Sequence, residues 1–340
     1  MDPLSHAACG RVLVALVPAD RLRRAHVAAA TLGALSPDLD AVFMPFGWDR
    51  YLRVHEIGTH TILGTIACAL LTGIVLHAFA RRQPWTWLAA AAWLGAISHV
   101  LLDLVSSARL RVFWPFLDRQ VSLPVVAMAD PWLAGLLAAG VVALWRIRTR
   151  PERVAAATLA VTVGFLTLKA ALGFRAVAAY EAAQQRESSP ATARLVEARW
   201  ASVLEWNVFD RTRDHVRFWK ATAGPGGARL QLAWPLPPES SALAASRSLS
   251  TVRNFLRVHH LGFAAVVPQA DGRKRILWSD IRYCWNPSGG GAPQLEPRIV
   301  QEGVTLACAL WFGGEFDRHD NALQQVVTIG GFTQSRPAGD

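Results

Sequence analysis

The chain has 340 residues, of which 52% are apolar, a fraction high enough to indicate membrane-spanning segments. Its 35 lysines and arginines outnumber 25 acidic residues, but no nucleic-acid-binding motif accompanies the net charge of +10, so no nucleic-acid partner is expected. The four cysteines stand apart and form no C-x-x-C pair, which excludes a thiolate zinc motif or a redox motif of that kind.

Residues 1–60 are expected to form two short helices and the loops that follow them. The stretches 4–17 and 21–35 each predict a helix too short to cross a bilayer, which would lie against a helical bundle or in the membrane interface. Features of a cleaved signal peptide do not precede them, so insertion is expected to rely on the later spans. The next Ser-Pro pair should end the second helix and leave Asp38 and Asp40 in a loop.

Apolar segments of bilayer length predict a polytopic α-helical membrane domain of about four transmembrane helices over residues 61–180. The expected spans are Thr61–Phe79, Trp87–Val105, Pro131–Ile147 and Val154–Ala179. A short linker joins the first two spans, so they should pack as an antiparallel pair through stripes of small residues. The stripes are His60, Gly64, Cys68 and Thr72 on one helix and Ala92, Ala96, His99 and Asp103 on the other. The spans together predict a multi-pass membrane protein.

The composition changes after the polar connector 181–190, where short alternating segments separated by turn residues predict strands. The expected strands are Val203–Val208, His215–Ala221, Arg229–Trp234, Phe263–Val267, Arg275–Trp285 and Thr305–Phe312, with one helix over Ser240–Val258. Residues 190–340 are therefore expected to form a soluble α+β domain.

One pair of ionisable residues stands out inside the second expected span. His99 and Asp103 are four residues apart, so a helix places both side chains on one face. Ionisable residues within a bilayer are costly, and those that occur usually face the protein interior and mark function. His60 opens the first span and Asp103 closes the second, so the two lie at the same level of the membrane. The alternative is an intramembrane pair in which His99 and Asp103 bond only to each other.

Further histidines and carboxylates are expected on the same side of the membrane. The full set is His6, Asp38, Asp40, His55, His60, His99 and Asp103. Nitrogen and oxygen donors without sulfur suit Zn²⁺, Mn²⁺ or Fe²⁺, and this many donors can serve one or two divalent ions, zinc foremost. Two-metal sites hold both the attacking and the leaving oxygens of a phosphate ester. Asp40 and Glu56 are candidates for proton transfer.

Each of these residues also has a structural interpretation, which the sequence leaves open. Asp38 and Asp40 are also compatible with ordinary loop or helix-capping carboxylates. His55 and His60 are compatible with histidines at the membrane interface.

Asp118 with the adjacent Arg119 is expected to form an ion pair or to contact lipid headgroups. The Asp-Pro pair at 130–131 is typical of a helix N-cap followed by proline at the first helical position.

Three separated motifs carry a resemblance to a known family. Gly33-Ala-Leu-Ser-Pro-Asp-Leu-Asp40, His55-x-x-x-Thr-His60 and Ser98-His-x-x-x-Asp103 resemble, in this order, the YdjM family of predicted membrane-bound metal-dependent hydrolases. That family is itself similar to the zinc-dependent phospholipase C and single-strand nuclease superfamily. Over residues 1–180 the resemblance implies the seven ligands named above and a multi-pass protein of a bacterial-type inner (plasma) membrane. Two departures argue against a full three-zinc site: Glu56 stands where the family often has arginine, and the chain contains no H-x-x-x-E.

These observations predict a membrane-bound metal-dependent hydrolase acting on a phosphoester, either a small molecule or a lipid reaching the site from the membrane. The alternatives are a non-enzymatic metal-binding membrane protein and an ion or proton transporter that uses His99 and Asp103 as a relay. Transport favours polar groups spread through the membrane depth, whereas these groups gather at one end.

The distribution of arginines predicts how the protein lies in the membrane. Two short loops, 80–86 and 146–153, carry six arginines, whereas the longer 106–124 loop carries three. Short loops rich in arginine stay in the cytoplasm, so the metal site and the C-terminal domain are expected outside. Six arginines in the first 60 residues act against this orientation.

Overall fold

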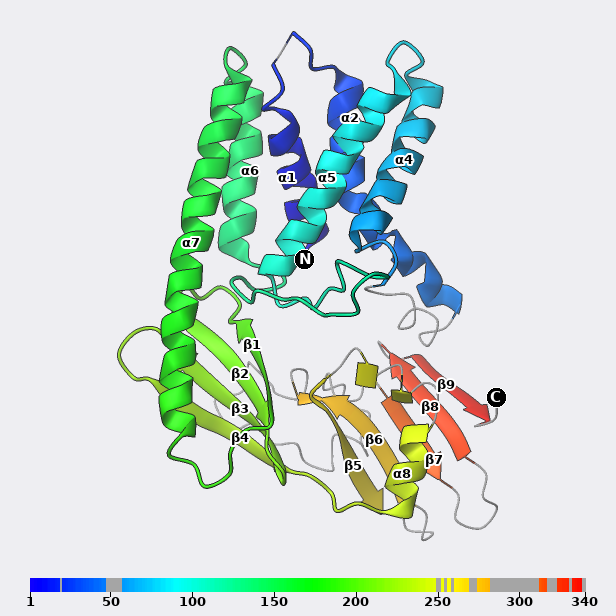
Figure 1. Cartoon of the computed structure of the whole chain (residues 1–340), viewed down its shortest axis with the longest axis vertical. Helices are drawn as coiled ribbons and strands as arrows, with labels where there is room; N and C mark the ends of the chain where they lie inside the picture. Colours follow the sequence, from blue (N-terminus) through cyan, green and yellow to red (C-terminus); the bar gives the residue numbers. More distant parts are fainter. Residues whose placement is uncertain are drawn as a thin grey trace. The chain divides into compact units, whose positions relative to one another are not determined.

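The structure is a computed structural model, and it describes residues 1–18, 20–46, 57–248, 252–253, 256–257, 260–268, 274–281, 312–316, 323–329 and 332–337. These residues form two compact units. A helical unit contains Met1–Ala176 together with Glu197–Trp206, and a sheet unit contains Val177–Val196 and Asn207–Asp340. Figure 1 shows the elements of both.

The helical unit is built from six α-helices and one 3-10 helix among its described residues. They are α1 (Pro3–Val14), α2 (Arg24–Leu35), η1 (Ser36–Phe46), α4 (Ile62–Phe79), α5 (Trp85–Val105), α6 (Pro131–Arg146) and α7 (Pro151–Gln184), whose last turns belong to the sheet unit. Side chains at the helix starts satisfy free backbone N–H groups: Asp2 accepts from Ser5, Thr61 from Gly64, and Asp130 from the second and third residues of α6. The N-cap predicted at Asp130 is thereby confirmed.

Three helices, α4, α5 and α7, are long and apolar enough to cross a membrane. The remaining expected span is α6, which has 16 residues and is therefore about 24 Å long at 1.5 Å per residue, less than the ~30 Å of a bilayer core. The expected count of four spans is thus supported for three helices only.

Helix α2 packs more deeply in the bundle than its length suggested. Its Ala29 lies in one apolar cluster with Ala69 of α4 and with Leu88 and Ala92 of α5. The small-residue stripe of α5 therefore packs against α2 as well as against α4. Figure 1 shows α2, α4 and α5 in the same part of the bundle. Helix α1 packs in turn against α2, α5 and α6.

The 3-10 helix η1 corrects one expectation. The Ser-Pro pair ends α2 as predicted, but the chain then continues directly into η1 rather than into a loop, so Asp38 and Asp40 lie on a helical turn. Ser36 helps this transition because its hydroxyl donates to the carbonyl oxygen of Gly33 at 2.7 Å. The two carboxylates are consequently held on a defined backbone at the end of α2.

Two sheets make up most of the sheet unit, although the end of β1 and the start of β2 belong to the helical unit. One has the strand order β1-β2-β3-β4, formed by Ala193–Ala198, Glu205–Arg211, His215–Thr222 and Ala228–Pro235. The other is antiparallel throughout, with β5 (Gly262–Pro268), β6 (Lys274–Asp280), β7 (Phe312–Phe316), β8 (Leu323–Ile329) and β9 (Phe332–Pro337) in sequential order. Helix α8 spans Ser241–Ser248 and precedes the second sheet.

Several observed strands begin or end at residues other than those expected. The segments expected near 203–208, 215–221, 229–234 and 263–267 are β2 to β5, each longer or displaced, while β1, β8 and β9 were not expected. The strand expected over Thr305–Phe312 shares only Phe312 with β7, and the rest of it lies outside the described residues. The expected helix over 240–258 is α8, which ends at Ser248.

A buried carboxylate organises the first sheet. Asp210 accepts hydrogen bonds from Arg217 at 2.7 and 2.9 Å, from the hydroxyl of Tyr180 at 2.7 Å and from the indole of Trp219 at 3.0 Å. These donors satisfy both carboxylate oxygens, so the group serves structure and is not available as a ligand.

Candidate metal centre

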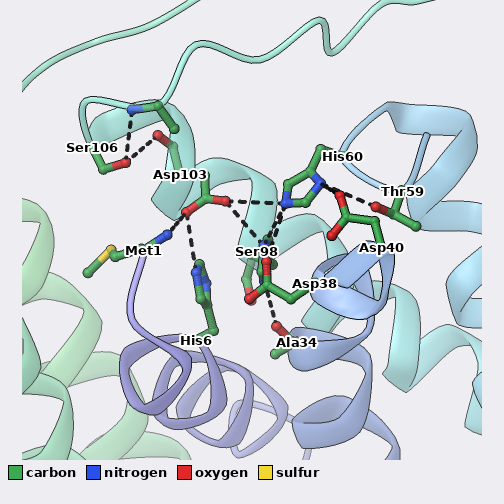
Figure 2. A network of polar contacts seen from close by, with 12 residues as sticks. Met1, His6, Ala34, Asp38, Asp40, Thr59, His60, Ser98, Asp103 and Ser106 are labelled. Carbon is green, nitrogen blue, oxygen red and sulfur yellow. Dashed lines mark hydrogen bonds and ion pairs between the residues drawn. The ribbon is translucent and has the colours of Figure 1, made fainter. Parts of the chain in front are cut away.

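Side chains from four separate segments of the helical unit converge at one point (Figure 2). His6 comes from α1, Asp38 and Asp40 from η1, His60 from the residue before the N-cap of α4, and His99 and Asp103 from α5. The sequence prediction that these six residues lie together agrees with their contacts. His55 and Glu56, the other two residues predicted for this site, lie outside the described residues.

His99 is the centre of the cluster. Its Nδ1 lies 2.8 Å from the carbonyl oxygen of Ala34, at the end of α2. A carbonyl oxygen can only accept, so Nδ1 carries a hydrogen and donates it. The other ring nitrogen, Nε2, lies 3.1 Å from Oδ2 of Asp103, 3.5 Å from Oδ1 of Asp38 and 3.3 Å from Nε2 of His60. A lone pair facing two carboxylates is unfavourable, so Nε2 needs a proton or a cation between itself and these oxygens.

His60 presents its two ring nitrogens to different groups. Its Nε2 faces the centre, 3.5 Å from Asp38 and 3.6 Å from Asp103. Its Nδ1 lies 3.7 Å from Oδ2 of Asp40 and 3.2 Å from the hydroxyl of Thr59. Partners on Nδ1 fix the orientation of the ring, which leaves Nε2 directed at the cluster.

His6 stacks on His99, with ring centroids 3.6 Å apart and the planes within 14° of parallel. Both ring nitrogens of His6 are buried, and neither has a well-formed hydrogen bond to the described residues, although Nε2 lies 3.3 Å from Oδ1 of Asp103. That same carboxylate oxygen contacts the amino group of Met1. A buried imidazole whose nitrogens lack well-formed hydrogen bonds is costly, and a bound cation would satisfy one of them.

The cluster is buried except at Asp38. The side chains of His6, His60, His99, Asp40 and Asp103 are at most 5% exposed, whereas that of Asp38 is 41% exposed. Asp38 therefore forms the open edge of the site, through which a ligand would reach the buried groups.

Local electrostatics suit metal ligation. Burial acts to raise the pKa of Asp38, but the hydrogen bond with His60 and the charges of His99 and His60 hold that pKa below its usual value. Burial lowers the pKa of His6 and outweighs the carboxylate of Asp103, which acts to raise it. Around neutral pH the carboxyl of Asp38 is therefore ionised and the imidazole of His6 is neutral, and these are the protonation states that the two residues need as metal ligands.

Two sets of three residues bring their donor atoms within 4.8 Å of one another. They are His6, Asp38 and His99, and His60, His99 and Asp103. These buried groups can therefore hold a metal ion, and because the donors are imidazole nitrogens and carboxylate oxygens, they fit the divalent metal that the sequence predicts.

Two contacts of the site were not predicted. The carbonyl oxygen of Ala34 leaves no sequence signal, since any residue could supply it at the end of α2. The contact of Thr59 with His60 follows from their adjacency in the Thr-His motif, but its geometry depends on the turn before α4. The pairing of Asp118 also differs from expectation, because its partner is Arg111, at 2.8 Å, rather than Arg119.

Comparison with known proteins agrees with the motifs. The family model for the YdjM inner membrane protein matches residues 1–180, which contain all six described residues of the cluster. Comparisons with curated proteins and with solved structures found no match. The matched region covers more than half of the chain and contains the apolar helices α4 and α5. The chain therefore belongs to the YdjM inner membrane protein family.

Proposed function

We propose that this protein is a membrane-bound metal-dependent hydrolase that acts on a phosphoester. The observation that carries the proposal is the arrangement at His99, where Nδ1 donates to a carbonyl and Nε2 faces two carboxylates and a second imidazole. A divalent cation at this point accounts for the contacts of His99 and would give one ring nitrogen of His6 a partner stronger than its 3.3 Å contact with Asp103.

The roles of the residues follow from which atom faces the centre. We assign the ligands to His6, Asp38, His60, His99 and Asp103. The two groups of three share His99, whose Nε2 has a single lone pair, so they are alternative ligand sets for one ion, and a second ion would need His55 or another donor in place of His99. Asp40 faces the outer nitrogen of His60, so its proposed role is to orient that ring rather than to bind metal. His55 and Glu56 stay in the proposal on sequence grounds, as a further ligand and as a proton donor.

Hydrolysis of a phosphoester at this site needs few groups besides the metal ligands. A divalent metal at this centre, zinc foremost, would polarise a phosphoryl oxygen and lower the pKa of water. Asp38, at the exposed edge, is the carboxylate placed to meet an incoming substrate. The buried surroundings exclude bulk water and strengthen every charge interaction within the site.

A lipid or a small phosphoester is the proposed substrate, because the site belongs to a unit with lipid-exposed apolar helices. The exposed faces of α4 and α7 carry large apolar residues, including Leu70, Leu71 and Val163. We also propose that α6 crosses the membrane as a fourth, short span, which gives the multi-pass topology. Surrounding lipids can thin to match a helix of this length.

Hydrolysis of a panel of phosphodiesters and phospholipids by protein in nanodiscs tests the proposal. Metal-loaded wild-type protein should release product from at least one class, and Asp38→Asn should reduce turnover strongly while His77→Ala, at the far end of α4, should not. Protein that holds metal but hydrolyses none of these substrates would support a non-enzymatic metal-binding role. Proton uptake coupled to ion flux in proteoliposomes would support the transporter.

A further inference from the structure

The segment between α5 and α6 carries a cluster of exposed apolar side chains. Residues 113–117, with the sequence Phe-Trp-Pro-Phe-Leu, are all exposed, and Phe116 is 83% exposed. We call these five residues the aromatic tip. Water-exposed aromatic residues are unfavourable, and so large an apolar cluster indicates a surface that contacts a partner or a membrane.

The base of this loop is firmly packed, so the exposure of the tip is not a consequence of a loose loop. Leu110 and Val121 form a β-bridge that closes the loop, and the amide of Ile62 donates to the carbonyl oxygen of Val112 at 3.0 Å. Leu110 and Val112 are buried in one cluster with Val100 of α5. The tip therefore projects from an anchored base.

Several backbone N–H groups within the tip are satisfied by the loop itself. The amide of Trp114 donates to the carbonyl oxygen of Arg111 at 2.9 Å, and those of Phe116 and Leu117 donate to Phe113 at 3.0 and 3.1 Å. Backbone pairing of this kind lowers the cost of moving a segment from water into an apolar environment.

The tip lies at the level where the membrane-spanning surface ends. Val112 is bonded to the first residue of α4, whose exposed face carries large apolar side chains from Leu63 to Val75. The tip therefore begins beside the first residue of α4, at the end of that exposed apolar surface. Aromatic residues are enriched at this depth, where the acyl chains meet the headgroups.

Charged groups flank the tip. Arg111 pairs with Asp118, and Arg119 is exposed beside them. Arginine next to an apolar segment at the interface can contact lipid phosphates. Apolar residues at the tip with charges at its base match the order of acyl chain and headgroup in a bilayer.

We propose that the aromatic tip inserts into the interfacial region of the bilayer that α4 and α5 span. Its occupant is phospholipid, not a protein partner. Because the amide of Leu123 returns to the carbonyl oxygen of Leu104, one residue from Asp103, this insertion holds the end of α5 at headgroup depth. The proposal depends on exposure and chain geometry alone and is independent of metal binding.

Collision accessibility of spin labels in nanodiscs tests this directly. In a full-length chain with its native cysteines replaced by alanine, labels are placed at Phe116→Cys and at Asp118→Cys, whose native side chain is 67% exposed. Leu71→Cys, on the exposed face of α4, serves as the lipid-facing reference. We expect oxygen to relax the labels at 116 and 71 more than a water-soluble nickel complex does, and the reverse order at 118.

Higher nickel than oxygen accessibility at 116 would overturn the proposal, and so would low accessibility to both, which would mean that protein covers the tip. Tryptophan fluorescence provides a second test that leaves the cysteines in place. The emission lost on Trp114→Phe should be quenched by phospholipids brominated near the headgroup end of the acyl chain. Unquenched Trp114 emission in such lipids would also overturn the proposal.

Discussion

His99 shows how one side chain can define a site. Its ring is held by a hydrogen bond to a backbone carbonyl at the end of α2 and by stacking on His6. The position of Nε2 is therefore fixed. Nε2 faces Asp38 of η1 and Asp103 of α5. A hydrogen bond from the ring nitrogen that does not bind the metal fixes the tautomer and orientation of a metal-binding histidine.

Asp40 offers a test of the assigned roles. In Asp40→Asn the carboxylate facing Nδ1 of His60 is replaced by a neutral amide, which weakens the orientation of that ring. Loss of an outer partner typically lowers metal affinity roughly 10–100-fold. Zinc titration with a competing chelator should show this decrease while the bound metal at saturation stays unchanged. A lower metal content at saturation would make Asp40 a direct ligand.

The candidate residues were predictable from sequence because their type and spacing carry the signal. His99 and Asp103 stand out as an i, i+4 pair within an apolar span, and Asp38 and Asp40 follow a helix-ending Ser-Pro pair. The difference between ligand and orienting residue was not predictable. It depends on which ring nitrogen of His60 faces Asp40, and that is set by the turn before α4.

At the scale of helices, close approach of α2 and α5 is what brings η1 to His99. A Cβ added at Gly33 would lie 2.1 Å from the carbonyl oxygen of Ala92, and one at Gly95 would lie 2.0 Å from that of Ala30. Neither helix backbone can accommodate these atoms without moving. Small residues at such crossings allow membrane helices to pack with their backbones in contact.

Gly95→Ala should therefore destabilise the helical unit, by about 1–3 kcal/mol as for other overpacked cores. Thermal unfolding of the detergent-purified variant would measure the loss. Gly135→Ala in α6 is the matched control, because nothing lies within 4 Å of its added Cβ. Gly135→Ala should leave the free energy of unfolding unchanged or raise it by less than about 1 kcal/mol. Equal stabilities for the two variants would contradict the packing of α2 on α5.

A second prediction concerns the buried ion pair of α7. Nζ of Lys169 lies 3.4 Å from Asp130 and donates to the carbonyl oxygen of Ser202 at 2.8 Å, with both charged side chains fully buried. Lys169→Met leaves a buried carboxylate uncompensated, which typically costs about 3–5 kcal/mol.

Adding Asp130→Asn to Lys169→Met should recover part of that loss in thermal unfolding, since asparagine keeps an oxygen for the α6 cap. The pair of Arg199 with Glu205, whose side chains are 34% and 29% exposed, is the control, and Arg199→Gln should change stability by no more than about 1 kcal/mol. A double variant no more stable than Lys169→Met alone would show that the two charges do not interact.

Helices of the bundle were more predictable than the strands, for a physical reason. Long apolar runs and capping residues such as Asp130 define α4 to α7 locally. The depth of α2 was not predictable, because it depends on Gly33 meeting Ala92, a contact distant in sequence. Strand β1 escaped prediction because Ala193–Ala198 mixes charged and apolar residues without clear alternation.

For the whole molecule, the arginine-rich short loops predict an orientation. The linkers after α4 and after α6 lie at the end of the bundle opposite the loop that follows α5 (Figure 1), and they carry Arg81, Arg82 and the cluster from Arg146 to Arg153. The positive-inside rule places them in the cytoplasm. Residues after α7 would then lie outside.

Labelling of intact cells with an impermeant thiol reagent tests this orientation. A cysteine introduced at Ser188 should react, and one introduced at Gln83 should react only after the cells are permeabilised. The variants need a background from which other accessible cysteines are removed; Cys9 and Cys68 are already buried. The reverse pattern of labelling would place the candidate metal centre on the cytoplasmic side.

Metal content is the most direct test of the central claim that the His–Asp cluster of the helical unit binds a divalent ion. Elemental analysis would be made on protein purified without chelators and dialysed against limiting zinc. Wild-type protein and His77→Ala, whose histidine instead contacts the carbonyl oxygen of Gln83, should retain a divalent metal. His99→Ala and Asp103→Ala, still inserted in the membrane, should lose it. Equal metal content in all four proteins, or none in the wild type after dialysis, would contradict the account.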